Sequence, residues 1–141
     1  MTPAEELRRV REGVDSQVPP AETDMLEAPG DEATLGRVRE VLEIVLARAG
    51  EAGEWPGADE WRRLLPAWFT AASVNDAEVR DCVLDRWSLR AWTYWFQPDL
   101  RKWRWWDARV DDGRVLVTLL VLQRPYLRGA LEWLMKVARE A

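Results

Sequence analysis

The chain contains no histidine and only one cysteine, Cys82. Without histidine, the nucleophile–histidine pairs of common hydrolases and zinc sites built on imidazole are excluded. A single cysteine cannot form an intrachain disulfide, so nothing indicates an oxidising compartment and we expect a cytoplasmic protein. Glycine-rich phosphate-binding motifs and Cys-x-x-Cys pairs are also missing. We therefore expect neither a cofactor nor a metal ion.

Long apolar runs are missing as well. The first residues lack the apolar core of a signal peptide, and no later stretch approaches the roughly 18 apolar residues that a membrane span needs. Lysine is scarce too, with Lys102 and Lys136 the only lysines among 20 basic residues. We interpret this bias as a trace of GC-rich coding sequence rather than of function, and we expect no membrane association.

The first 33 residues differ in composition from the rest. They contain nine acidic side chains against three arginines, few apolar residues and the pair Pro19-Pro20. Such a segment buries too little apolar surface to offset the entropy of ordering. The composition predicts a flexible acidic leader over 1–33 and a single globular domain over 34–141. Within the leader, Leu7 and Val10 recur at helical spacing and leave room for a short helix over 3–13.

Beyond the leader, apolar residues recur every three or four positions, which predicts helices. Ser88 can cap one of them, and Pro66 should separate two short ones. The predicted helices cover 34–49, both sides of Pro66, 76–83 after a cap at Asp76, 88–96, and the C-terminal segment from Pro125, whose inner stripe starts at Leu127.

Two β-rich runs flank Asp112-Gly113, which is the strongest short-range signal for a hairpin. An unbroken register opposes residues whose numbers sum to 225. This register places Trp106 on the core face, opposite Leu119, and leaves Trp103 and Trp105 on a mixed face. The predicted fold is therefore α+β, with helices packed around a two-stranded antiparallel hairpin.

Ten tryptophans are the feature that most needs an explanation. Five of them lie on predicted inner stripes and are assigned to the core: Trp61, Trp68, Trp92, Trp106 and Trp133. The candidate binding residues surround the mixed face of the hairpin: Arg101, Trp103, Trp105, Asp107 and Arg109. Aromatic rings beside arginine are typical of protein interfaces and of stacking sites. A helix covering this face would instead make both rings part of the core.

These observations favour a non-catalytic protein-binding domain, such as an adaptor or an immunity-like inhibitor, and a second copy of the chain is one candidate partner. The alternative is a small-molecule or carbohydrate-binding domain with a tryptophan-lined pocket and polar groups such as Arg90, Tyr94 or Asp107. A third reading is an enzyme using Asp81 and Asp85, which lie four residues apart and would share one face of a helix. Next to Arg80 and Arg86, they more simply form a solvated surface.

Residues 86–109 form a basic segment, with six cations against two acids. This charge is too small to favour nucleic-acid binding, which the acidic leader would also oppose. A further hypothesis is that the leader folds over the basic segment and competes there with an acidic partner.

Three short motifs carry a resemblance to other proteins. They are Leu-Pro-Ala-Trp-Phe at 65–69, Arg-Lys-Trp-Arg-Trp-Trp-Asp-Ala at 101–108 and Gly-Ala-Leu-Glu-Trp-Leu at 129–134. Together they resemble small, uncharacterised, tryptophan-rich actinobacterial proteins, although Arg104 interrupts the tryptophan row of that pattern. The resemblance implies a bacterial source and a shared fold, and it implies no activity.

Overall fold

The computed structural model describes residues 1–13, 18–74 and 87–141. Its elements, in chain order, are α1 (Pro3–Glu12), β1 (Thr23–Pro29), α2 (Glu32–Ala49), α3 (Ala58–Leu64), α4 (Ala67–Thr70), α6 (Leu89–Tyr94), β2 (Trp103–Asp111), β3 (Arg114–Val121) and α7 (Gly129–Glu140). None of the described helices is both long and apolar enough to cross a membrane. The helix predicted over 76–83, with Cys82 and the Asp81/Asp85 pair, lies outside the described residues.

The sheet has three antiparallel strands in the order β1-β3-β2. The helices and this sheet confirm an α+β fold, but the prediction of a two-stranded sheet is wrong. The third strand comes from the predicted leader, because β1 pairs along β3 from Thr23 opposite Leu120 to Pro29 opposite Arg114. Since an isolated hairpin is only marginally stable in water, this strand adds backbone hydrogen bonds that the hairpin alone would lack.

The leader also contributes a helix. Helix α1 begins after Thr2, whose side chain accepts a hydrogen bond from the backbone of Glu5 while the Glu5 side chain accepts one from the Thr2 backbone. This reciprocal cap confirms the short helix expected within 3–13. Val10 on α1 is fully buried, and α1 packs against α2 and β2. Two parts of the segment expected to be flexible are therefore a helix and a strand in the structure.

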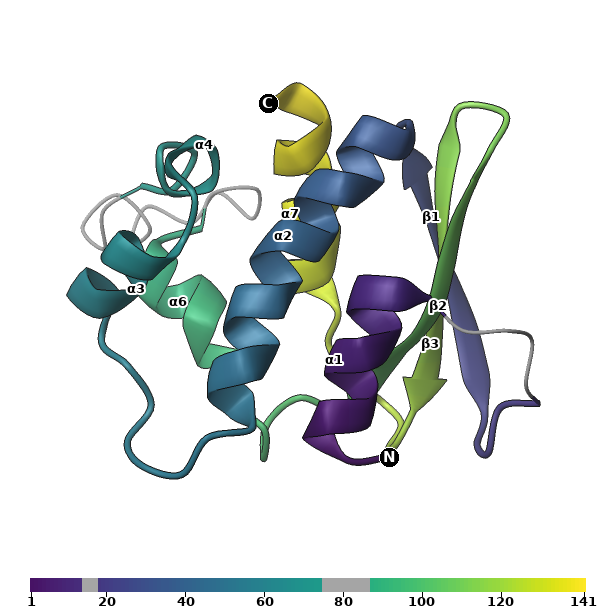
Figure 1. Ribbon diagram of the computed structural model, residues 1–141, viewed down its shortest axis with the longest axis horizontal. Coiled ribbons are helices and arrows are strands. Elements are labelled where there is room, and N and C mark those ends of the chain that lie inside the picture. The colour runs from purple at the N-terminus through teal and green to yellow at the C-terminus, as the bar shows by residue number, and fades with distance from the viewer. Residues whose placement is uncertain (14–17, 75–86) are drawn as a thin grey trace.

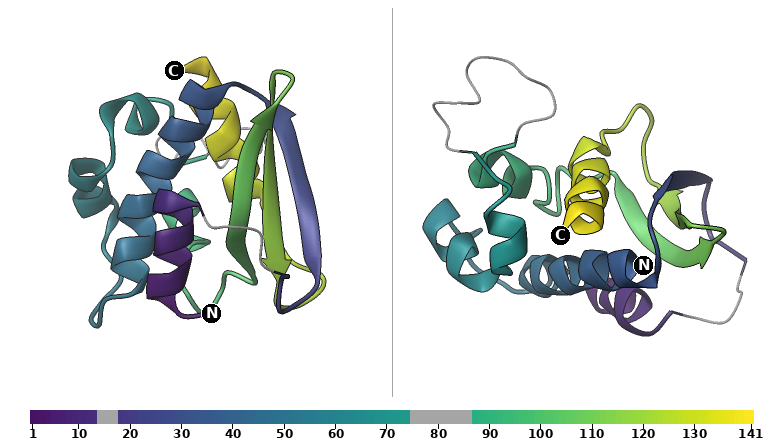
Figure 2. Two further views of the ribbon diagram at one scale, coloured as in Figure 1. Left: turned by 45° about the vertical axis from the view of Figure 1, so that its right-hand side comes forward. Right: turned by 90° about the horizontal axis from the view of Figure 1, so that it is seen from above.

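The molecule is built in layers (Figures 1 and 2). Helices α1, α2 and α7 cover one face of the sheet, and the short helices α3, α4 and α6 lie on the side of α2 and α7 that is away from the sheet. Asp31 caps α2, whose Val38, Val41 and Val45 are fully buried. The core therefore fills the space on both sides of α2 and α7.

Most of the helices predicted beyond the leader are confirmed. Helices α3 and α4 meet at Pro66, and the Ser88 hydroxyl caps α6 by accepting from the Ala91 backbone. The C-terminal helix is an exception, because it begins at Gly129 rather than at Pro125. Leu127, assigned to its inner stripe, is instead 67% exposed in the preceding loop. That loop is held to β1 by side-chain contacts, so it does not continue the helix.

The predicted hairpin turn is confirmed. Asp112 and Gly113 both have positive φ, 49° and 74°, as a two-residue type I′ turn requires. The predicted register is correct from Asp111 back to Asp107 and then shifts by one residue at Trp106. An extra residue on one strand is a β-bulge, and it interrupts the alternation of side chains between the two faces.

The bulge reverses the prediction for the aromatic face. Beyond it, Trp105 pairs with Leu119 and Trp103 with Val121, so both rings fall on the core side of the sheet. Trp103 is 3% exposed and Trp105 is fully buried. The prediction that these two tryptophans lie on the mixed face is therefore wrong, because a regular two-residue alternation does not pass through a bulge. Both rings are nevertheless in the core, the outcome stated as the alternative to an open face.

Four of the five tryptophans assigned to the core are buried, which confirms that part of the prediction: Trp61, Trp92, Trp106 and Trp133. Trp68 is half-buried at the edge of the core. Phe69 lies among these rings, with centroid distances of 4.6 Å to Trp92 and 5.3 Å to Trp133 in edge-to-face orientations. Such contacts stabilise the core beyond the apolar area that they bury.

Tryptophan accessibility tests this arrangement. Trp95 is the most exposed of the ten tryptophans, at 37%. We expect Trp95→Phe to remove the component of fluorescence that acrylamide quenches most readily and to change the free energy of unfolding by no more than about 0.5 kcal/mol. Trp105→Phe should leave that component in place and lower the free energy of unfolding by about 1–3 kcal/mol. Loss of the readily quenched component in Trp105→Phe would contradict the bulged register.

Candidate functional site

The five residues proposed from the sequence as a binding face do not share one surface. Trp103 and Trp105 belong to the core, and Arg101 is buried. Asp107 and Arg109 lie on the opposite face of the sheet, where they pair with Thr118 and Leu116 as predicted. Asp107 is half-buried and only Arg109 is exposed. The structure therefore separates a buried group near the start of β2 from two polar residues further along the strand.

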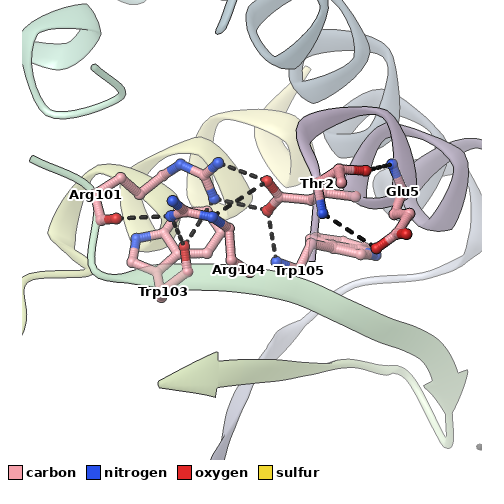
Figure 3. Close-up of polar contacts among 7 residues, drawn as sticks. Thr2, Glu5, Arg101, Trp103, Arg104 and Trp105 are labelled. Atoms are coloured by element: carbon pink, nitrogen blue, oxygen red, sulfur yellow. Dashed lines mark hydrogen bonds and ion pairs between the residues drawn. The ribbon is translucent and has the colours of Figure 1, made fainter. Parts of the chain in front are cut away.

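A buried ion pair organises the start of β2 (Figure 3). The Arg101 guanidinium donates two hydrogen bonds to the Glu6 carboxylate, with Nη1–Oε2 and Nη2–Oε1 distances of 2.7 and 2.6 Å. The two side chains are only 3% and 2% exposed. Because removing one partner from such a pair leaves an uncompensated buried charge, the two residues depend on each other. The pair ties α1 to the chain just before β2.

Glu6 also binds the strand itself. Its Oε2 accepts a hydrogen bond of 2.7 Å from the Trp105 backbone N–H, next to the bulge. Arg101 Nη1 in turn donates to the Trp103 carbonyl at 2.8 Å, and Arg104 donates to the same carbonyl at 2.9 Å. Burial, together with the nearby Arg101 charge, lowers the pKa of Arg104. One carboxylate thus satisfies donors from a side chain and from the strand backbone.

A second arginine of α1 covers the bulge. The Arg9 guanidinium lies 3.4 Å from the centroid of the Trp106 ring and donates to the Trp106 carbonyl at 3.2 Å. The acidic leader therefore does lie against the basic segment, as the sequence suggested. The contact is made through the buried acid Glu6 and a stacked arginine rather than through net charge. Competition with an acidic partner at this place stays a prediction.

An apolar pocket of about 190 Å³ opens between α6, the start of β2 and the start of α7. It is lined by Trp87, Trp95, Phe96, Trp103, Leu127, Gly129 and Ala130. Trp95 and Leu127 remain 37% and 67% exposed. Large exposed side chains that flank a pocket are typical of interaction sites rather than of an ordinary surface. Of the residues proposed from the sequence, Trp103 alone contributes to this pocket.

Local sequence explains the pocket. Trp92 and Phe96 are four residues apart on the buried side of α6 and its end, so Trp95 between them points away from the core. The Trp92 indole donates to the Ala130 carbonyl at 2.8 Å and joins α6 to the first turn of α7. Helical spacing alone does not decide whether Trp95 or Phe96 faces inward, and the structure shows that Phe96 does.

The loop that carries Leu127 is anchored to β1. Arg124 binds the Asp24 carboxylate through both Nη atoms, at 3.1 and 2.7 Å, and Tyr126 donates its hydroxyl proton to the same carboxylate. Hydrogen bonds from Arg124 and Tyr126 lower the pKa of Asp24 to about 2. Sequence reasoning missed this cluster, because its members lie about a hundred residues apart and form no local motif.

A polar groove of about 560 Å³ lies between residues 55–60 and α6. Its walls carry two aromatic rings, Trp55 and Tyr94, and several polar groups. Arg90 and Tyr94 were named from the sequence as polar groups for a ligand pocket, and the structure does bring them to one groove. Asp107, named with them, does not line it. Trp55 is half-buried.

Within residues 1–13, 18–74 and 87–141, no three acidic or cysteine side chains come together as metal ligands would. No protein-family model, curated protein or solved structure shows significant similarity to the chain. The candidate site therefore rests on its own geometry, and two cavities beside α6 are candidate places for a ligand.

The pH dependence of the stability that Asp24 contributes provides a test. Its pKa is lower in the folded chain, about 2, than the value near 4 expected for an unfolded chain. The ionised carboxylate therefore stabilises the fold above about pH 4, and this contribution is lost as the pH falls towards 2. We expect Asp24→Asn to be less stable than wild type at neutral pH, and the difference to shrink between pH 4 and 2. Urea unfolding at each pH measures it.

The matched control is Asp99→Asn, which removes an exposed carboxylate that lies in a turn and has no hydrogen bond or ion pair to the described residues. Its stability difference from wild type should stay near zero across the same range. A constant difference for Asp24→Asn down to pH 2 would show that the cluster does not act through the charge of Asp24.

Proposed function

We propose that the chain is a non-catalytic protein-binding domain whose site is the apolar pocket beside α6 rather than the face of the sheet. The observation that carries this proposal is the exposure of Trp95 and Leu127 at the margin of a pocket with aromatic walls. Tryptophan is among the residues that contribute most binding energy at protein interfaces, especially around pockets that exclude water. The single cysteine further supports a cytoplasmic setting for this binding.

The pocket defines the chemistry of its occupant. A volume of about 190 Å³ suits one large apolar side chain, and apolar walls favour leucine, methionine or an aromatic residue. Cations lie next to the lining residues along the chain, with Arg128 between Leu127 and Gly129 and Lys102 before Trp103. Complementary charge steers and orients partners. The proposed partner is therefore a protein segment with one large apolar side chain flanked by acidic residues.

The pocket is held in place before a partner arrives. The bond from the Trp92 indole to the Ala130 carbonyl fixes α6 against α7, and the contacts of Arg124 and Tyr126 with Asp24 fix the loop that carries Leu127. A site that is already ordered loses less conformational entropy on binding, so even a small apolar contact can yield measurable affinity. These contacts favour binding in an ordered pocket rather than by a segment of this chain that folds only when the partner binds.

Filling the pocket provides the test. A Cβ added at Gly129 would lie 3.5 Å from the Trp87 ring, so the side chain of Gly129→Leu is directed towards the pocket without a steric clash at Cβ. Peptides should first be selected from a random displayed library on wild type, and we expect them to share one large apolar residue with acidic neighbours. Gly129→Leu and Trp95→Ala should each weaken the selected peptide by about tenfold or more, as measured by fluorescence anisotropy.

Gly36→Leu is the matched control. Gly36 lies on the exposed side of α2, where an added Cβ meets no atom within 4 Å, so this substitution adds the same side chain away from the pocket. It should leave peptide affinity unchanged. Equal binding to wild type and Gly129→Leu, or a selection without a common apolar residue, would contradict the proposed site.

A further inference from the structure

The polar groove on the other side of α6 differs from the apolar pocket in shape and chemistry. Its volume of about 560 Å³ falls within the range of roughly 300–1,000 Å³ that is typical of small-ligand sites. Tyr94 lines the groove, whereas its neighbour Trp95 lines the pocket. Two consecutive residues at the end of one short helix thus face two different cavities.

One aromatic wall of the groove is fixed in position. The Trp55 indole N–H donates to the Thr93 carbonyl at 3.2 Å, and its ring lies 5.1 Å from the ring of the fully buried Trp61. Trp55 nevertheless keeps part of its surface accessible. The second ring, Tyr94, is 49% exposed. The groove therefore offers two aromatic surfaces, one of which cannot turn away.

The polar groups of the groove are available to a ligand. The Asp59 and Arg90 side chains line it and make no hydrogen bond or ion pair with any described residue. The Gln97 amide nitrogen donates to the Tyr94 carbonyl at 3.2 Å, which leaves the Gln97 side-chain oxygen as an acceptor. Glu60 is 3.6 Å from Arg48 in a partly exposed pair that contributes little to stability. Planar donors and acceptors thus surround the two rings.

We propose that this groove binds a neutral saccharide. The apolar C–H face of a sugar ring can lie on Trp55 or Tyr94, which present apolar bodies at a polar surface. Adjacent hydroxyls can donate to the Asp59 carboxylate and accept from the Arg90 guanidinium, both of which are planar groups with paired hydrogen-bonding atoms. A groove of this volume has room for more than one sugar unit. Free oligosaccharides and exposed polysaccharide chains present the same chemistry.

The charge of the groove argues against an ionic ligand. Asp59, Glu60 and Arg90 all line the groove, and none of them is deeply buried. The two carboxylates would therefore repel an anion, and the guanidinium would repel a cation. A neutral polyol uses both kinds of group as hydrogen-bond partners without an unpaired charge. This site is independent of the protein-binding pocket, so either proposal can fail without the other.

Calorimetric titration with neutral mono- and disaccharides of glucose, galactose and N-acetylglucosamine tests the proposal. We expect saturable binding of at least one disaccharide, and Tyr94→Ala should weaken it about tenfold or more. Arg90→Gln should also weaken it. Co-sedimentation with insoluble glucan and chitin distinguishes a polysaccharide ligand from a free oligosaccharide. A chain that sediments with either polymer but binds disaccharides only weakly recognises a polysaccharide. Either form of binding supports the proposal if Tyr94→Ala abolishes it.

Leu127→Ala is the matched control, because it removes an exposed apolar side chain from the other cavity and leaves Trp95 in its edge-to-face contact with Tyr94, 5.2 Å between ring centroids. It should weaken the selected peptide and leave sugar affinity unchanged, whereas Tyr94→Ala should do the reverse. Both positions are exposed, so neither variant is expected to unfold. Absence of saturable sugar binding at millimolar concentrations, or sugar binding that survives both Tyr94→Ala and Arg90→Gln, would overturn the proposal.

Discussion

The structure depends on one buried carboxylate. Glu6 pairs with Arg101 and accepts the Trp105 backbone N–H, so a single side chain of α1 holds the segment before β2 and the strand next to its bulge. A buried ion pair of this kind contributes little net stability, because both charges lose their hydration. It instead specifies one conformation of the chain, because the two charges must meet in one geometry. Here the chosen arrangement places Trp103 and Trp105 in the core and leaves Trp103 as a wall of the apolar pocket.

Sequence patterns predicted the local elements well. Helical spacing located α2, the break at Pro66 and the start of α6, and Asp112-Gly113 located the hairpin turn. The sequence patterns failed where contacts with a distant segment determine the local structure. A strand at 23–29 is weakly apolar and pairs with the distant strand β3, which composition does not reveal. The bulge at Trp106 is likewise fixed by contacts with α1, because Arg9 and Glu6 bind the two residues at its centre.

The candidate site was predicted only in part. The alternation rule assigned Trp103 and Trp105 to the mixed face of the hairpin, and a shift of one residue moved both into the core. Trp95, the exposed ring beside the apolar pocket, was not assigned to a surface, because a helix of one and a half turns has no clear inner face. Arg90 and Tyr94, named as polar groups for a ligand pocket, line one groove in the structure, and binding of a ligand there stays a proposal. The whole cavity also needs Trp55, which lies in a loop that no periodicity describes.

The most direct test of the central claim is a double-mutant cycle on Glu6 and Arg101, with unfolding free energies measured in urea. Glu6→Gln keeps an oxygen for the Trp105 N–H but removes the charge, and Arg101→Met removes the cation. Each single variant should lower the free energy of unfolding by about 3–5 kcal/mol, because each leaves a buried charge without its partner. The double variant should lower it by about 1–3 kcal/mol less than the sum of the two single effects. Arg8→Met, an exposed change on the same helix, should cost almost nothing. Additive costs for Glu6→Gln and Arg101→Met would contradict the view that this pair organises the fold.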